Sequence, residues 1–207
     1  MATKIAKDQC QVLVVGAGPA GAATAYHLAK AGIDVLVLEK SAFPRDKICG
    51  DGLTPGAVKE ILAMGINPVE EGWQVNRGLS VIGGGHRITL PWPEKSSLPS
   101  YGLTCKRTEL DQRLIQQAVA CGARLIENTA VQDLLTDADG YACGVSAIAR
   151  EPQTRQKKNR EFRARYVVDC TGANARLASR QGRTPLKNRP MAVAARAYFY
   201  SPRGNEK

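Results

Sequence analysis

A glycine-rich turn near the N-terminus constrains this 207-residue chain more than any other feature of its sequence. The turn, Gly16 to Gly21, has the sequence GAGPAG and follows the short apolar run Val12 to Val15. A stretch compatible with a helix, Pro19 to Ala31, ends at Gly32 before a second apolar run, Ile33 to Leu38. This order predicts a strand, a helix and a parallel strand, the unit that opens a doubly wound α/β fold.

The glycines of this turn have separate physical tasks in such a unit. Gly16 permits the tight turn, Gly18 lets the backbone approach a pyrophosphate, and Gly21 lets helix and strand pack closely. Free N–H groups at the helix N-terminus favour the negative charge of phosphates. Glu39, at the end of the second apolar run, is placed to accept a hydrogen bond from a ribose hydroxyl and to repel a 2′-phosphate. We therefore expect the adenosine of FAD or NAD here, and not that of NADP.

Two further elements are predicted before residue 100. Thr54 and Pro55 form an N-cap and first-turn pair for a helix that ends at Gly65. Apolar residues then alternate with polar ones on both sides of Gly83, Gly84 and Gly85, which predicts a β-hairpin. The apolar positions of this hairpin are Leu79, Val81, Ile88 and Leu90.

The following hundred residues indicate one helix and several strands. Thr108 and Asp111 form a candidate capping box for a helix that ends at Gly122. Residues 125–135 are expected to be extended. Residues 145–148 are expected to pair with 162–168 across a polar tip, residues 151–160, whose simplest interpretation is a solvated loop.

Composition excludes several classes of protein. Hydrophobic residues make up 43% of the chain and charged residues 23%, which is ordinary for a folded globular protein. The net charge is +10, and residues 150–207 hold 15 of the 29 basic residues but 4 of the 19 acidic ones. Aromatic residues are only 5%, which argues against a base-stacking nucleic-acid platform. We expect no nucleic-acid partner, and the basic region favours peripheral contact with an anionic bilayer.

The cysteines indicate a reducing compartment. The six cysteines include no C-x-x-C pair and no Cys/His cluster with zinc spacing, so no metal site is expected. Lys4 and Lys7 precede an apolar stretch as in a signal peptide, but Asp8 and Gln11 interrupt that pattern. No window approaches the roughly 18 uninterrupted apolar residues that a bilayer span needs. We expect a cytoplasmic protein whose membrane contact, if it has one, is peripheral at the inner face.

Four segments carry a family resemblance: GAGPAG, FPRDKICGDGLTP from Phe43 to Pro55, RTELDQRL from Arg107 to Leu114, and RPMAVAARAYFYSPR near the end. Together they resemble the geranylgeranyl reductase family of FAD-dependent reductases, which is related to p-hydroxybenzoate hydroxylase. The segment CGDGLTP is most similar to the actinobacterial branch that includes menaquinone reductase. The resemblance implies an α/β, Rossmann-like FAD-binding domain followed by the beginning of an antiparallel β substrate domain.

The resemblance also implies which residues bind FAD. The glycine turn would hold the pyrophosphate, Glu39 the adenosine ribose, Arg107 a phosphate or ribose, and the backbone at Val131 the adenine. A surface arginine at a strand end is the alternative for Arg107. The loop after the second strand would lie along the flavin. The full set is Gly16, Gly18, Pro19, Ala20, Gly21, Glu39, Lys40, Arg45, Cys49, Gly50, Asp51, Arg107 and Val131.

Cys49 is the candidate catalytic residue, because it is the one thiol in this glycine-rich loop; a small packed thiol is the alternative. By the resemblance, reduced flavin gives a hydride to one carbon of an isoprenoid alkene, and water or Cys49 protonates the other. The substrate would be a geranylgeranyl group or a prenylated quinone such as menaquinone. The electron donor would be NADPH, ferredoxin or similar. A flavin monooxygenase of the same fold and an inactive FAD-binding fragment remain as alternatives.

Two departures from the family pattern accompany the resemblance. In the segment Val167 to Arg176, which resembles the second flavin motif, Thr171 stands for the usual acid and Ala175 for the serine. A third motif is expected beyond position 207, so we expect this chain to be the N-terminal half of a longer enzyme. The expected organisation is residues 1–75 and 101–182 as two segments of the FAD-binding domain, 76–100 as a hairpin of the substrate domain, and 183–207 as the start of that domain.

Overall fold

A computed structural model describes residues 8–94, 97–173, 176–182 and 192–202. Ala175 and residues 183–191, which figure in the expectations above, lie outside the described residues. The strands are β1 (Gln9–Val15), β2 (Val35–Leu38), β3 (Gly52–Leu53), β4 (Gln74–Asn76), β5 (Gly78–Gly83), β6 (His86–Pro91), β7 (Gly102–Thr104), β8 (Arg124–Ile126), β9 (Thr129–Thr136), β10 (Ala142–Arg150) and β11 (Lys157–Asp169). The helices are α1 (Pro19–Lys30), α2 (Pro55–Ala63), α3 (Arg107–Ala120) and α4 (Arg176–Arg180).

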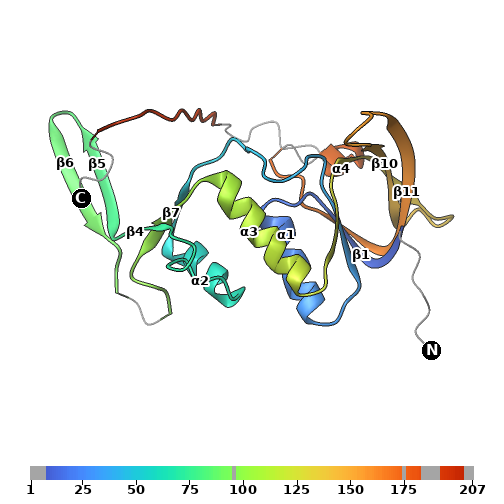
Figure 1. Cartoon of the computed structure of the whole chain (residues 1–207), viewed down its shortest axis with the longest axis horizontal. Helices are drawn as coiled ribbons and strands as arrows, with labels where there is room; N and C mark the ends of the chain where they lie inside the picture. The colour runs from blue at the N-terminus through green and yellow to red at the C-terminus, as the bar shows by residue number, and fades with distance from the viewer. Residues whose placement is uncertain (1–7, 95–96, 174–175, 183–191, 203–207) are drawn as a thin grey trace.

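A six-stranded sheet in the order β8-β2-β1-β11-β10-β9 forms the centre of the molecule. Neighbouring strands among β8, β2, β1 and β11 pair in parallel, while β10 pairs antiparallel with both β11 and β9. Helix α1 joins the parallel neighbours β1 and β2, and it packs beside α3 (Figure 1). The predicted strand, helix and parallel strand, and with them the α/β fold class, are confirmed.

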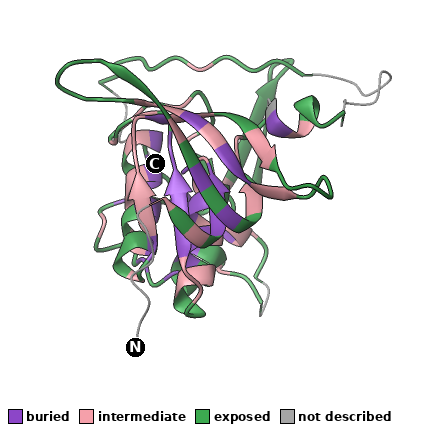
Figure 2. Cartoon of the chain, turned by 90° about the vertical axis from the view of Figure 1, so that its right-hand side faces the viewer, coloured by how far each residue is buried: buried purple, intermediate pink, exposed green. Residues whose placement is uncertain are grey.

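The alternation of β1 explains why this sheet is buried on both faces. Val12 and Val14 belong to the apolar cluster that the helices cover, whereas Leu13 and Val15 belong to a second cluster with Phe162. Successive side chains of a strand point to opposite faces, so an uninterrupted apolar run needs cover on both sides. Figure 2 shows the buried residues gathered in these central strands.

The long strand β11 changes partner along its length. Its first part pairs antiparallel with β10, from Arg150 opposite Lys157 to Gly144 opposite Arg163. Its second part, residues 163–169, pairs in parallel with β1 instead. The expected pairing of 145–148 with 162–168 is therefore wrong in register, because the apolar end of β11 completes the central sheet. The tip also shortens, since β11 already begins at residue 157.

The start of α3 differs from the expected capping box. The helix begins at Arg107, and Lys106 occupies the N-cap without a side-chain hydrogen bond. Asp111 instead turns inward, where its Oδ1 accepts a hydrogen bond of 2.9 Å from the Nε of Arg107. An ion pair within the helix thus engages the carboxylate that the local cap was expected to use. The expected extended stretch 125–135 is likewise divided into β8 and β9, because Asn128 has a φ of 53°.

Two small sheets extend from the central one. Strands β3, β7 and β4 form a three-stranded sheet, while β5 and β6 form the predicted hairpin. Leu79 lies opposite Leu90 and Val81 opposite Ile88, and all four side chains are exposed. The hairpin projects from one end of the molecule (Figure 1). Among the described residues, no helix is long and apolar enough to cross a membrane.

Candidate cofactor site

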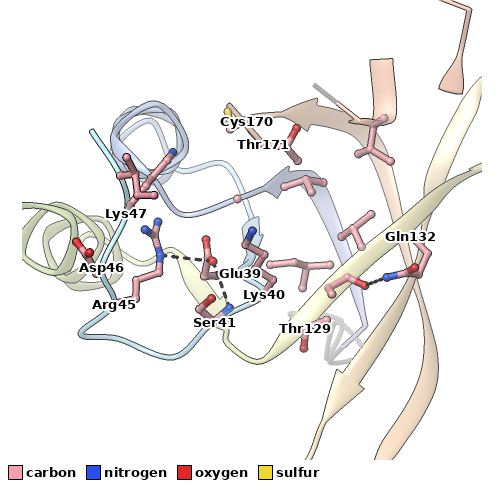
Figure 3. A pocket seen from close by; sticks show the side chains of 18 of the residues that line it. Glu39, Lys40, Ser41, Arg45, Asp46, Lys47, Thr129, Gln132, Cys170 and Thr171 are labelled. Carbon is pink, nitrogen blue, oxygen red and sulfur yellow. Dashed lines mark hydrogen bonds and ion pairs between the residues drawn. The ribbon is translucent and has the colours of Figure 1, made fainter. Parts of the chain in front are cut away.

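A cavity of about 540 Å³ opens where β1 and β2 end, the edge at which doubly wound sheets bind ligands. Its walls come from the glycine turn, the loop after β2, the start of β9 and the end of β11 (Figure 3). Six of the predicted cofactor-binding residues line it: Gly16, Gly18, Glu39, Lys40, Arg45 and Val131.

The glycine turn fits a dinucleotide because side chains are excluded where the backbone must be approached. Gly16 has a φ of 97°, and a Cβ placed there would lie 2.7 Å from the carbonyl oxygen of Cys170. A Cβ on Gly21 would lie 1.8 Å from the carbonyl oxygen of Gly16, so only glycine allows α1 to pack this closely. Gly18 is the N-cap of α1, and the first turn of that helix carries no acidic residue. The helix N-terminus is therefore suited to an anion.

Glu39 is held rigidly beneath this turn. Only 4% of the residue is exposed, and its Oε2 accepts a hydrogen bond of 2.8 Å from the backbone N–H of Ala17. Its Oε1 accepts one of 3.2 Å from Ser41 and lies 3.4 Å from the Nε of Arg45. A carboxylate fixed in this way and lining the cavity presents acceptor oxygens at a defined place, as recognition of ribose hydroxyls requires.

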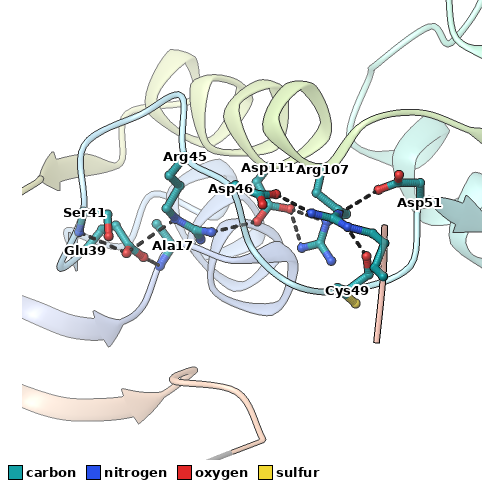
Figure 4. A network of polar contacts seen from close by, with 10 residues as sticks. Ala17, Glu39, Ser41, Arg45, Asp46, Cys49, Asp51, Arg107 and Asp111 are labelled. Atoms are coloured by element: carbon teal, nitrogen blue, oxygen red, sulfur yellow. Dashed lines mark hydrogen bonds and ion pairs between the residues drawn. The ribbon is translucent and has the colours of Figure 1, made fainter. Parts of the chain in front are cut away.

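Behind Glu39 lies a buried row of charges, shown in Figure 4. Arg45 donates from Nη1 to Oδ2 of Asp111 at 3.1 Å, and Arg107 donates to the other oxygen of that carboxylate. Asp111 is 0% exposed and Arg107 4% exposed. The four side chains alternate in sign and balance in charge, which makes their burial tolerable. The Nε of Arg45 is buried and has no hydrogen-bond partner among the described residues, so it retains a donor.

Lys47 is a site residue that the sequence analysis missed. Its Nζ lies 3.2 Å from the place a Cβ on Gly18 would take, and 3.4 Å from the corresponding place on Gly172. The side chain therefore bridges two glycine turns at the mouth of the cavity (Figure 3). Within the described ranges it makes no hydrogen bond or ion pair. An unpaired ammonium at this point is suited to a phosphate. In the sequence, its position two residues after Arg45 was the signal that could have identified Lys47 as a site residue.

Several predicted residues lie outside the cavity wall. Cys49 and Gly50 are exposed on the loop that continues beyond Lys47, and Asp51 ends that loop beside β3. Arg107 supports Asp111 from within the protein, and Pro19, Ala20 and Gly21 form the first turn of α1 behind Gly18. Contacts of these residues with a cofactor remain predictions.

Two other thiols near the site, those of Cys105 and Cys170, are kept in the less reactive protonated form by burial. Burial raises the pKa of Cys105 to about 12, and nearby carboxylates of Glu109 and Asp51 add to that effect. Burial likewise raises the pKa of Cys170, which lines the cavity. Both thiols are therefore protonated near neutral pH. Among the described residues, no group of His, Cys, Asp and Glu side chains is arranged to hold a metal ion.

The end of β11 accounts for one departure from the family pattern. The Oδ1 of Asp169 accepts hydrogen bonds from the backbone N–H of Thr171 at 3.0 Å and from its hydroxyl at 2.6 Å. The carboxylate is thus engaged with its own turn, while Thr171 faces the cavity. At the position where the resemblance implies an acid, Thr171 thus presents a hydroxyl oxygen whose proton is already donated to Asp169.

Comparison with known proteins agrees with this geometry. Residues 9–195 match a family model described as FAD binding domain. The menaquinone reductase of Mycolicibacterium smegmatis is 38% identical over 198 residues, which are 96% of this chain and 46% of that protein. Digeranylgeranylglycerophospholipid reductase 1 of Methanopyrus kandleri is 32% identical over 84% of this chain and 42% of its own length. These relatives confirm the resemblance drawn from the motifs.

Solved structures share the fold. The myxobacterial chondrochloren halogenase CndH has a TM-score of 0.73 at 25% identity, over 83% of this chain and 39% of its own. A geranylgeranyl bacteriochlorophyll reductase-like protein from Thermoplasma acidophilum has a TM-score of 0.70 at 22% identity, over 89% of this chain and 44% of its own. The chain spans about half the length of the curated relatives it matches.

Proposed function

The chain belongs to the family of FAD-binding domains, and on that premise we propose that it is the cofactor-binding part of an FAD-dependent reductase of isoprenoid double bonds. The proposed substrate is a geranylgeranyl group or the side chain of menaquinone. The observation that carries this proposal is the similarity to a menaquinone reductase over nearly the whole chain. FAD, when bound and reduced, supplies the hydride that such a reduction needs.

In this proposal different residues of the cavity bind different parts of the cofactor. The glycine turn and the ammonium of Lys47 hold the pyrophosphate, and Glu39 accepts hydrogen bonds from the adenosine ribose. Arg107 acts through Asp111, whose carboxylate fixes Arg45 at the wall of the cavity. The loop after Lys47 follows the flavin.

Cys49 is the proposed proton donor. Saturation of one double bond adds a hydride to one carbon and a proton to the other. The Cys49 thiol is exposed on its loop, so it is accessible to a substrate placed against the flavin. After giving its proton to the second carbon, the thiolate recovers one from water. The two electrons come from a reduced donor such as NADPH or ferredoxin.

We propose a matching division of the chain. Residues 1–75 and 101–182 form the FAD-binding domain, residues 76–100 belong to a substrate domain, and residues 183–207 begin that domain. The assignment of residues 76–100 is supported by the apolar face of the β5–β6 hairpin, where the side chains of Leu79, Val81, Ile88 and Leu90 are exposed to solvent. An apolar, water-excluding wall is what a prenyl chain requires.

A single-turnover experiment tests the reductase. The chain, supplied with the C-terminal half of the Mycolicibacterium smegmatis relative in trans, is loaded with FAD, photoreduced under argon with EDTA as the electron donor and mixed with menaquinone. We expect flavin oxidation together with a side chain two mass units heavier. Quinone with an unaltered side chain would contradict the proposal. In air, substrate-dependent oxygen consumption and a product heavier by one oxygen atom would instead identify a monooxygenase of the same fold.

The proposed location is the cytoplasm, with peripheral contact at the inner face of the cell membrane. The β10–β11 hairpin supports the membrane contact because Arg150, Arg155, Lys157 and Lys158 are exposed around its tip, where Glu151 is the acidic residue. Exposed cations near an anionic bilayer are attracted to it, and salt screens that attraction. We expect binding to vesicles containing phosphatidylglycerol at low salt, and none to neutral vesicles.

A further inference from the structure

The segment 192–202 passes the loop of residues 46–51, although almost 150 residues separate the two in sequence. Arg196 makes the contact. Its Nη2 donates to Oδ1 of Asp46 at 2.6 Å, and its Nη1 donates to the carbonyl oxygen of Cys49 at 3.1 Å. The same Nη1 lies 3.3 Å from Oδ1 of Asp51. One guanidinium therefore reaches three residues of one loop.

Tyr198 adds a second point of attachment. Its hydroxyl donates to Oδ2 of Asp51 at 2.7 Å, so both oxygens of that carboxylate are engaged from the same segment. The guanidinium of Arg196 also lies over the Tyr198 ring, with its Cζ 4.7 Å from the ring centroid. Residues two apart in an extended segment point to the same side, which explains how both reach the loop.

The ionisation states fit a persistent contact. The hydrogen bond from Arg196 lowers the pKa of Asp46, so this carboxylate stays ionised to lower pH than an ordinary one. The hydrogen bond to Asp51 raises the pKa of Tyr198, which keeps its hydroxyl a donor. Arginine is charged throughout this range. The pair of Arg196 and Asp46 is therefore fully charged at neutral pH.

Between Asp46 and Gly50, the only further hydrogen bond among the described residues is a local one, from the backbone N–H of Lys47 to the Asp46 carboxylate. Asp51 has one backbone bond, from Cys105 N–H at 3.1 Å, before β3 begins. A side chain that satisfies a loop carbonyl and two loop carboxylates at once determines the path of the backbone between them. Only 16% of the Arg196 side chain is exposed, which favours one fixed geometry.

We propose that Arg196 is a positioning residue, which together with Tyr198 fixes the loop of residues 46–51 and so sets where the Cys49 thiol stands. The guanidinium engages the Cys49 carbonyl and leaves the thiol exposed. The consequence for catalysis rests on the proposed function of Cys49, whereas the fixing of the loop does not. The loop can therefore be tested by itself in the 207-residue chain.

Tryptic cleavage after Lys47 is the first measurement, because a protease cuts a loop only when its backbone opens into an extended conformation. In Arg196→Gln we expect this cleavage to accelerate about tenfold, because the opening equilibrium loses charged hydrogen bonds. Arg196→Lys should restore part of the resistance, and Tyr198→Phe should lower it less than Arg196→Gln does. Arg150→Gln removes the same charge from β10 and is the matched control. An unchanged rate of cleavage after Lys47 in Arg196→Gln, with β1 and β2 still resistant, would overturn the proposal.

The visible spectrum of the FAD-loaded chain is the second measurement. If the loop lies against the flavin, Arg196→Gln should shift the flavin absorption bands, Arg196→Lys should reverse part of that shift, and Arg150→Gln should not shift them. Faster cleavage after Lys47 without a spectral change would uphold the positioning of the loop and contradict its proposed place beside the flavin. The positioning of the loop by Arg196 and the place of the loop beside the flavin can therefore be rejected independently of each other.

Discussion

The loop that follows β2 has two halves that are held in opposite ways. Residues 41–45 lie against buried charge: Ser41 bonds to Glu39, and Arg45 to Asp111. Residues 46–51 are mostly exposed, with Ile48 77% exposed, and are attached to a segment almost 150 residues later. The side of the site proposed for the adenosine is thus built by the compact domain itself. The side that carries the thiol depends on chain that arrives much later in the sequence.

The largest expected effect is on the first half, from Asp111→Asn. This change leaves Arg45 and Arg107 buried without their shared carboxylate, which costs on the order of 3 to 5 kcal/mol. Urea unfolding of the purified chain measures it. Glu161→Gln, which breaks an exposed pair with Arg163, is the control and should leave the midpoint unchanged. A wild-type midpoint in Asp111→Asn would show that the buried row does not hold this half.

Glu39→Ala should have the next largest effect, on cofactor affinity. The variant loses the acceptor proposed for the ribose, so FAD binding should weaken by about 1.5 to 3 kcal/mol, the range for a hydrogen bond to a charged group. Titration of FAD fluorescence measures the change. Glu60→Ala, on the exposed side of α2, removes the same charge and should bind FAD like wild type. Unaltered affinity in Glu39→Ala would remove this residue from the site.

Lys47→Ala tests the boundary between the two halves. We expect FAD affinity to fall several-fold at low salt, and the difference from wild type to shrink as salt screens the charge. Lys47→Arg should keep most of the affinity, and Lys59→Ala, an exposed lysine of α2, serves as the control. A difference that is independent of salt would mean that Lys47 shapes the cavity without pairing with a phosphate.

Cys49→Ala should have the smallest effect on folding and FAD affinity, each within about 0.5 kcal/mol, because the exposed side chain is removed while the carbonyl that Arg196 engages is kept. Reduction of the double bond in single turnover should nevertheless fall by ~100-fold or more if the thiol is the acid. Wild-type turnover in this variant would leave the loop with a role in cofactor binding only.

Local pattern was sufficient to predict the elements whose residues decide their own structure. The apolar runs of β1 and β2, the glycine turn and the β5–β6 hairpin are predictable because periodicity and turn chemistry act over a few residues. The same turn and its acid also located the cavity, since Gly16, Gly18 and Glu39 follow the strands whose ends form it.

What the sequence alone did not reveal depends on partners far along the chain. Asp111 has the spacing of a helix cap, yet it is buried between two arginines, one of them 66 residues away. Lys47 acquires its place only when the two glycine turns meet. The contact of Arg196 with the loop of residues 46–51 has no local signature, because an arginine in an extended segment is ordinary until its neighbours are known.

Because β11 lies between β1 and β10, the central sheet can be completed only after β11 has been synthesised. Strand β1 acquires β2 as a neighbour about twenty residues after it leaves the ribosome, but its other edge waits for residues 163–169. At 5–20 residues per second that interval lasts roughly 8 to 30 s. During this interval the backbone groups along one edge of the apolar strand Gln9–Val15 are unpaired, and they can pair with other nascent chains. The central sheet therefore cannot be completed in the cell before residue 169 has been synthesised, and slower elongation before that residue lengthens the exposure.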